Sequence, residues 1–327
     1  MKKITSEDTL GIFFIAQFGI GFIGNTLLFL LHIKTLIFQP HKKKPIVLIR
    51  THLILANVMT ILFSGIPEIV HFFGLRNFLD DIGCKAVLYM YRVSRGLSLC
   101  TMSFLSMFQA VIIIPSNSRW AWLKSKVSSY IFPVFSFFWL INMLIYVRVI
   151  QRVKASYNIS GAEQAYSLNY CMARDPDKLK SAAFLGGMVA RDFLCLFIMI
   201  WTSGHMVIML FTHRKTVQYV HRASLYPVSS PETKATHTIL ALVICFFFFH
   251  WTNSCFTIYV SYRHNVQGLE NINIFLSSCY PAICPFLMIQ NSNRGSFLNS
   301  VFAKMRKSFP KTISLGGFLH TSVARGM

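Results

Sequence analysis

Long uninterrupted apolar runs dominate the pattern of hydrophobic and polar positions along the chain. A helix needs about 20 mostly apolar residues to cross a hydrocarbon core of about 30 Å. These runs do not alternate every second residue, as the strands of a membrane barrel do. We therefore expect an all-α membrane protein, a seven-transmembrane helix bundle. The predicted spans are Leu10–Leu31, Leu53–Phe73, Ala86–Pro115, Val127–Val147, Ala182–Phe211, Thr236–Tyr262 and Ile272–Ile289.

The composition supports a membrane protein and argues against a soluble one. Hydrophobic residues make up 54% of the 327 residues and charged residues 13%, whereas about 25% of a soluble domain is charged. The formal net charge is +21, which by itself is also compatible with binding to nucleic acid. Here the basic residues stand between apolar runs, which is typical of anchors at a membrane surface. We expect contact with membrane lipid and no nucleic acid.

The distribution of Lys and Arg predicts how the chain is oriented. An odd number of spans places the two termini on opposite sides of the membrane. With the N-terminus outside, most of the Lys and Arg between the spans lie on the inner side, as the positive-inside rule requires. We expect an extracellular N-tail over residues 1–9, a seven-span domain over 10–290 and a cytoplasmic tail over 291–327.

The motifs of common enzymes and cofactor sites are absent from the sequence. It contains no HExxH, CxxC, Gly-rich phosphate loop or GxSxG, so nothing indicates catalysis, a cofactor or a metal site. His205, His237 and His250 lie in spans, where we interpret them as hydrogen-bonded packing residues. Because the N-tail is too short to form a domain, a small ligand would have to enter the helix bundle itself.

Two of the 8 cysteines lie outside the predicted spans. On the predicted topology, Cys84 is at the outer start of the third span and Cys171 is in the second outer loop. The outer side is oxidising, so a disulfide between them is the expected state and two free thiols is the alternative. Asn158-Ile159-Ser160 in the same loop is a glycosylation acceptor.

Five ionisable residues fall within the outer halves of the spans. Arg92 and Arg95 are about 12–16 Å deep, at 1.5 Å per residue after Cys84. Arg191 and Asp192 are adjacent, about 100° apart around their helix, so we expect that they do not face each other and that each finds a partner on another helix. Such residues mark structural ion pairs or a functional site. The complete set is Glu68, Arg92, Arg95, Arg191 and Asp192.

If these five residues form a ligand site, their charges predict the kind of ligand. Three cations and two anions leave one positive charge, which favours a weakly anionic and mostly apolar ligand. We expect it between the third, fifth and sixth spans. On the inner side, Arg214, Lys215 and Arg222 are either lipid anchors or part of a surface that docks a cytoplasmic partner.

Several motifs resemble those of G-protein-coupled receptors, and their combination resembles one family, the vomeronasal type 1 pheromone receptors. Rhodopsin-like receptors carry Asp-Arg-Tyr at the inner end of the third span, whereas this chain has Ser106-Met107-Phe108-Gln109-Ala110. The matching segments are Gly24-Asn25, Leu53-x-x-Ala56-Asn57, Arg92-Val93-x-Arg95-Gly96, Leu105–Ala110 continuing to Pro115–Ser118, Arg191-Asp192, Ser229–Thr236 and the Pro281/Pro285 pair.

This resemblance implies a pheromone receptor in the plasma membrane of vomeronasal sensory neurons. It implies a heterotrimeric G protein of the inhibitory class as partner, and Arg214, Lys215 and Arg222 are our candidates for coupling. The same superfamily pattern supports the Cys84–Cys171 pairing. A transporter or channel is the alternative function, but transporters commonly carry internal repeats with matching span-breaking residues, and the sequence shows neither.

Overall fold

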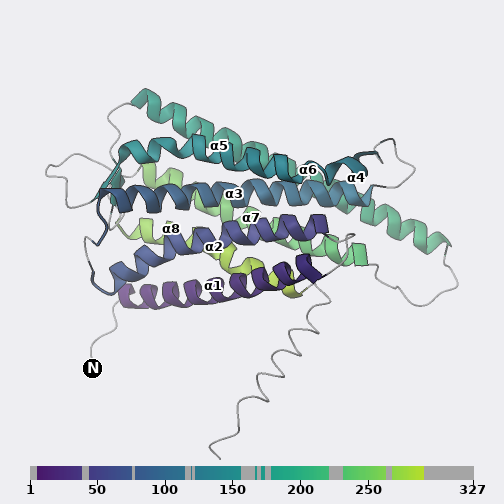
Figure 1. The fold of residues 1–327 in the computed structure, drawn as a ribbon, viewed down its shortest axis with the longest axis horizontal. Coiled ribbons are helices and arrows are strands. Elements are labelled where there is room, and N and C mark those ends of the chain that lie inside the picture. Colours follow the sequence, from purple (N-terminus) through teal and green to yellow (C-terminus); the bar gives the residue numbers. More distant parts are fainter. Residues whose placement is uncertain are drawn as a thin grey trace, which may run out of the picture.

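The computed structural model describes residues 6–38, 44–75, 78–114, 119, 122–155, 166–167, 171–173, 178–220, 231–262 and 267–290. Its helices run roughly parallel along the long axis of the molecule (Figure 1). The elements are α1 (Ser6–Phe38), α2 (Lys44–Phe72), α3 (Asp81–Ile113), α4 (Trp122–Val127), α5 (Ile131–Arg152), β1 (Val153–Ala155), β2 (Tyr166–Ser167), β3 (Cys171–Ala173), α6 (Lys178–Val220), α7 (Pro231–Tyr262) and α8 (Gln267–Gln290).

The long helices agree with the seven predicted spans. Within the described residues, 6 helices are long and apolar enough to cross a membrane, and α8 contains the shorter apolar segment Ile274–Ile289. All 24 residues of α8 extend about 36 Å at 1.5 Å per residue, and its apolar segment is the shorter part of that length. The fold is therefore all-helical in its spans, as expected for a seven-helix receptor-like bundle.

Two features of the structure were not predicted, and the helices are longer than the predicted spans, α6 most of all. The six-residue helix α4 is too short for its sequence to show a helical period. The small antiparallel sheet, in strand order β1-β3-β2, depends on pairing between distant segments. α6 continues from the predicted end at Phe211 to Val220, because hydropathy marks where lipid contact ends and not where the helix ends.

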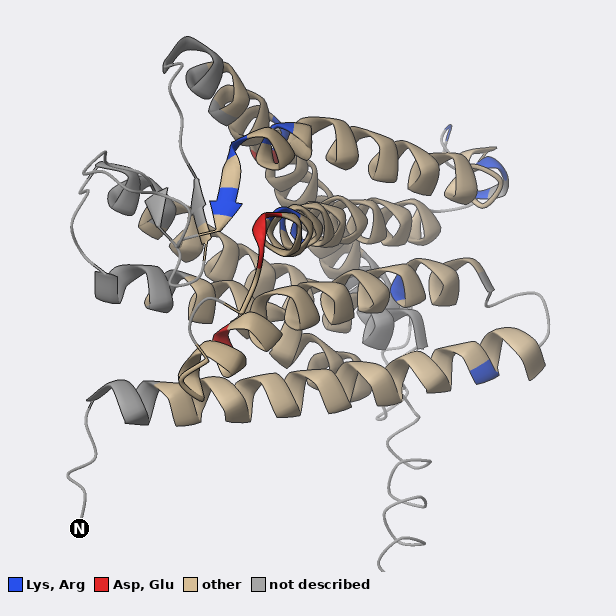
Figure 2. Ribbon diagram, turned by 60° about the vertical axis from the view of Figure 1, so that its left-hand side comes forward, with Lys and Arg blue, Asp and Glu red and all other residues tan. Residues whose placement is uncertain are grey.

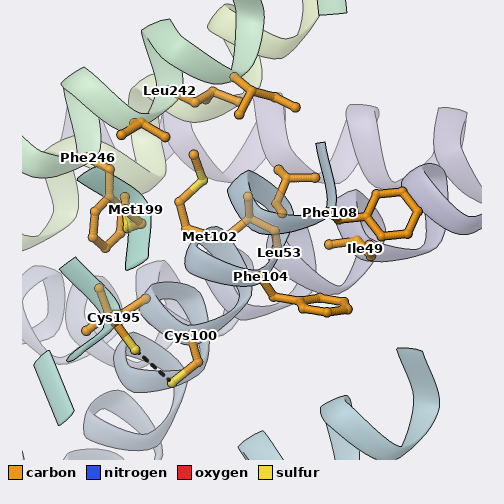
Figure 3. Packing of buried hydrophobic residues seen from close by; sticks show 14 of the residues in the cluster. Ile49, Leu53, Cys100, Met102, Phe104, Phe108, Cys195, Met199, Leu242 and Phe246 are labelled. Carbon is orange, nitrogen blue, oxygen red and sulfur yellow. Dashed lines mark hydrogen bonds between the residues drawn. The ribbon is translucent and has the colours of Figure 1, made fainter. Parts of the chain in front are cut away.

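The bundle is organised around α3, which lies between the other long helices (Figure 1). In the most apolar part of α3, 83% of the residues are buried, against 17% for α5. Figure 3 shows the side chains of Met102 and Phe104 on α3 packing among residues from neighbouring helices, such as Leu53 and Phe246. The hydrophobic core is thus centred on α3, whose side chains pack against those of the surrounding helices.

The outward faces of the helices are apolar. Phe132 and Leu140 on α5, with Phe197 and Trp201 on α6, are each more than half exposed. Lys, Arg, Asp and Glu are few along the described ribbon (Figure 2). A soluble protein rarely exposes such a large contiguous apolar surface, so these faces are in contact with lipid. The protein is a multi-pass membrane protein.

A disulfide closes one end of the bundle. Cys84 at the start of α3 is bonded to Cys171 on β3, with a Cα–Cα separation of 5.8 Å. The Asp81 carboxylate accepts a hydrogen bond of 2.6 Å from the backbone N–H of Ala155 on β1. The predicted disulfide is therefore present, and it fastens the sheet over the end of the bundle where α1 begins. We call this end the disulfide end.

A hydrogen bond from Asn25 on α1 to Pro281 on α8 joins these two helices. Pro285 has no N–H, so the carbonyl of Pro281, four residues earlier, lacks its usual helical partner. The buried Asn25 side chain replaces that partner, donating from Nδ2 to the Pro281 oxygen at 2.8 Å. Gly24 allows the approach, because a Cβ there would lie 3.1 Å from Pro285 Cγ.

We predict that Asn25→Leu destabilises the receptor by about 1–3 kcal/mol, the cost of leaving a buried carbonyl unpaired. The measurement is thermal unfolding of the purified protein in nanodiscs. The double variant Asn25→Leu/Pro285→Ala should recover part of the loss, because the new backbone N–H at position 285 can donate to Pro281. Ile23→Ala, at a lipid-facing position of α1, is the control. Equal stability of Asn25→Leu and Ile23→Ala would contradict the prediction.

Candidate functional site

A network of charged and polar side chains lies within the bundle and joins α3, α5, α6 and α7. Its centre is Arg191 on α6, whose side chain is 9% exposed. The guanidinium donates from Nη1 to Asn142 Oδ1 at 2.7 Å and from Nη2 to the Tyr146 hydroxyl at 3.0 Å, both on α5. It also lies 5.3 Å from the centre of the Tyr146 ring, in a cation–π contact. Each of these contacts stabilises a charge that is removed from water.

Arg191 and Asp192 bind each other, so the prediction that these two neighbours cannot face each other was wrong. The Asp192 Oδ1 atom accepts from Arg191 Nε at 2.9 Å and from Nη2 at 2.5 Å. The two side chains leave the helix in directions about 100° apart. The long arginine side chain curls back, and its fork of N–H groups reaches the adjacent carboxylate in a two-point contact. Partners on other helices complete the network.

Gly96 on α3 is needed for this network to form. A Cβ at this position would overlap Asn142 Oδ1 and would also clash with Nη1 of Arg191. Gly96 therefore provides the space in which α5 and α6 bring these two side chains against α3. Asn142 also points its Nδ2 at the thiol of Cys100, at 3.7 Å.

A pair of buried thiols lies next to the network. The Sγ atoms of Cys100 on α3 and Cys195 on α6 are 3.8 Å apart, as the dashed line in Figure 3 marks. Both residues are more than nine-tenths buried. Among the described residues, no group of three or more His, Cys, Asp or Glu side chains could hold a metal ion.

His250 on α7 connects the network to a cavity inside the bundle. Its Nε2 lies 3.4 Å from Asp192 Oδ2, and its ring stacks on Phe246 with centroids 5.4 Å apart. On its other side, His250 lines a cavity of about 30 Å³. The complete lining is Thr60, Arg95, Ser98, Phe246, Phe249, His250, Asn253, Leu276, Ser277, Tyr280 and Pro281.

The cavity lies between α2, α3, α7 and α8. The ligand was predicted between the third, fifth and sixth spans, which are α3, α6 and α7. Of the five predicted ligand residues, all of which the structure describes, Arg95 lines the cavity. Arg191 and Asp192 reach it through His250. Glu68 on α2 and Arg92 on α3 are partly buried and lie outside its lining.

Sequence reasoning placed His250 in helix packing and missed its second role. The same ring that stacks on Phe246 also lines the cavity, and only the neighbouring helices decide which histidine does so. His205 and His237, by contrast, are exposed. The signal that could have identified His250 is its position in the span that follows the one carrying the partly buried carboxylate of Asp192.

Two sets of predicted residues receive little structural description. Arg214 and Lys215 lie on the backbone of α6, in the part that extends beyond the predicted span, and their side chains are outside the described residues. Arg222 and the glycosylation acceptor Asn158 also lie outside the described residues.

Comparison with known proteins identifies the family. Residues 8–299 match the sequence profile of the vomeronasal organ pheromone receptor family. Vomeronasal type-1 receptor 3 of Homo sapiens is 32% identical over 315 residues, covering 95% of this chain and 100% of the relative. Vomeronasal type-1 receptor 1 of Gorilla gorilla gorilla is 33% identical over 305 residues, covering 93% and 86%. This chain belongs to the vomeronasal organ pheromone receptor family.

The similarity extends to fish. Olfactory receptor class A-like protein 1 of Danio rerio is 32% identical over 286 residues, covering 87% of this chain and 89% of the relative. Membership makes the protein a vomeronasal receptor of the G-protein-coupled type. The receptor family also argues against the alternative of a transporter or channel, and against an enzyme.

In this vomeronasal receptor, the segment that stands where rhodopsin-like receptors have Asp-Arg-Tyr is buried. Phe108 and Gln109 on α3 are each 2% exposed. Ser106, one turn before Ala110, is within 2.7 Å of the Thr202 hydroxyl on α6. In this region α3 is therefore joined to α6 by the packing of uncharged side chains and by the hydrogen bond between the Ser106 and Thr202 hydroxyls.

We predict that Gly96→Ala abolishes delivery of the receptor to the cell surface, because the added methyl group displaces the side chains that satisfy Arg191. Surface labelling and thermal unfolding measure the effect. Gly204→Ala in α6 is the matched control, since nothing lies within 4 Å of its added carbon and Ala is a better helix former than Gly by about 1 kcal/mol. Wild-type surface levels for Gly96→Ala would refute this role.

Proposed function

We propose that this vomeronasal receptor binds a small, mostly apolar pheromone in the cavity between α2, α3, α7 and α8. Binding there activates a heterotrimeric G protein of the inhibitory class. The observation that carries the proposal is the connection from the cavity through His250 to the Asp192–Arg191 pair. A ligand that moves His250 acts on groups that hold α5 and α6 together, and such linked helices are a route from a ligand to the opposite end of the bundle.

The same proposal includes a plasma-membrane location with the disulfide end outside. An oxidising compartment favours the Cys84–Cys171 bond, and the opposite end carries Lys34, Lys124 and Lys126, as expected for the cytoplasmic side. With this orientation the N-tail and the Asn158 acceptor are extracellular, and the tail over 291–327 is cytoplasmic.

The size of the cavity determines how a ligand enters. A volume of about 30 Å³ accommodates about two water molecules, so an organic ligand has to displace side chains. Phe249 is the suitable candidate to move, because it lines the cavity and is only partly buried. Arg95 on the wall supports the predicted preference for an anionic ligand.

The first test is a functional screen for the ligand, using surface-expressed receptor in cells with a promiscuous G protein and urinary and steroid fractions as stimuli. Wild type should respond to at least one fraction. Phe249→Ala enlarges the cavity. It should therefore lower the half-maximal dose of bulky ligands by about tenfold, the equivalent of 1.4 kcal/mol.

The control for the screen is Phe248→Ala, because Phe248 is the neighbouring aromatic residue and is 62% exposed on the lipid-facing side. Its dose–response curve should match that of wild type. A Phe249→Ala curve that coincides with the Phe248→Ala curve for every active fraction would place the ligand elsewhere.

The second test concerns coupling. Neutralising Arg214, Lys215 and Arg222 together should lower G-protein activation several-fold, because these cations can pair with acidic or C-terminal carboxylate groups of the partner. Surface levels and ligand binding should remain those of wild type, and inhibition of cyclic AMP formation is the measurement. Full signalling by the well-expressed triple variant would contradict a coupling role for these residues.

A further inference from the structure

One face of α3 runs past the cavity and continues beyond it at both ends. Its side chains stand at intervals of four, three and four residues, the spacing that places them on the same side of a helix. Arg95 and Ser98 line the cavity. Tyr91 is one turn nearer the disulfide end than Arg95. Met102 is one turn further from that end than Ser98.

Hydrogen bonds connect this face of α3 to α8 on both sides of the cavity. On the side of the disulfide end, the Tyr91 hydroxyl donates to Ser277 Oγ at 2.7 Å. On the opposite side, the Tyr280 hydroxyl donates to Met102 Sδ at 3.5 Å. Ser277 and Tyr280 both belong to the cavity lining, so the cavity lies between these two bonds.

The Tyr91–Ser277 bond lies between the cavity and the disulfide. Ile274, one turn before Ser277 on α8, belongs to the same buried cluster as Cys84 and Cys171. Ser277 donates its own hydroxyl hydrogen to the Ile274 carbonyl at 2.8 Å, and a carbonyl oxygen can only accept. The Ser277 oxygen is therefore the acceptor for Tyr91, and this chain of bonds holds α3 and α8 together next to the disulfide cluster.

We propose that the Tyr91–Ser277 hydrogen bond is the gate of the cavity, and that a ligand enters from the disulfide end by breaking it. This inference rests on the proposed function and adds the route of entry to it. Both side chains are only partly buried. One hydrogen bond contributes little net stability, because the separated groups bond to water instead. The gate therefore opens without unfolding of either helix, and movement of Phe249 then makes room for the ligand.

The test measures how fast a thiol inside the cavity reacts with a water-soluble reagent. Ser98→Cys places this thiol on the cavity wall and keeps a small side chain with a weak donor. The full-length receptor is held in nanodiscs and treated with sulfonatoethyl methanethiosulfonate, an anionic reagent that does not cross lipid. Peptide mass spectrometry measures the modification at position 98, so the native cysteines do not interfere.

Variants in this background assign the rate to the gate. Tyr91→Phe removes the hydroxyl and keeps the ring, so it should raise the rate of modification about fivefold, the effect of one hydrogen bond on the open population. Ser277→Ala removes the acceptor and should give a similar increase. It also decides the test if Tyr91→Phe fails to fold. The double variant should react no faster than either single variant, because both changes remove the same bond.

Tyr89→Phe is the matched control. Tyr89 is on the same helix, and its hydroxyl donates to the Met143 carbonyl on α5 at 3.2 Å, away from the cavity lining. This variant should leave the rate at position 98 unchanged. Equal rates for Tyr91→Phe and Tyr89→Phe would overturn the gate, and so would an absence of modification in every variant.

The outcomes separate the gate from the proposed function. Faster modification in Tyr91→Phe, without a signalling response to any fraction in the screen, would sustain the gate and count against the receptor function. A signalling response, together with equal modification rates in Tyr91→Phe and Tyr89→Phe, would uphold the receptor function and overturn the gate.

Discussion

The packing of the bundle depends on the burial of one guanidinium group. A charged side chain in the middle of a membrane is costly unless the protein supplies the partners that water would supply. Arg191 obtains a carboxylate from its own helix and an amide, a hydroxyl and an aromatic face from α5. These contacts determine how α5 and α6 sit against α3, and the bare backbone of Gly96 is the place where they fit.

The same constraint of satisfying polar groups without water governs the rest of the bundle. The carbonyl left unpaired by Pro285 is bound by Asn25 across α1 and α8. His52 on α2 has hydrogen-bond contacts with Thr101 on α3 at 2.8 Å and with Trp139 on α5 at 3.1 Å. Polar side chains therefore specify which helices are neighbours, while the apolar side chains provide bulk and lipid contact.

The cavity follows from this arrangement. It lies where the network ends at His250 and where aromatic side chains of α7 meet small hydroxyl residues of α2, α3 and α8. Hydroxyl groups of the wall donate to groups of the bundle itself, as Ser277 does to the Ile274 carbonyl and Ser98 to the Asn57 side chain. Arg95 on the same wall adds a cationic side chain to the cavity lining.

The sequence alone determined the class of the fold, because runs of apolar residues long enough to cross a bilayer admit few other structures. It also predicted the Cys84–Cys171 bond, because both cysteines fall on the oxidising outer side of the predicted topology. The family followed from motifs that are read directly along the chain. It could not show that Arg191 turns back to Asp192, because the path of a long side chain depends on what surrounds it. Only the tertiary structure placed the cavity at α2, α3, α7 and α8, since which face of each helix turns inward is decided by contacts between residues far apart in the chain.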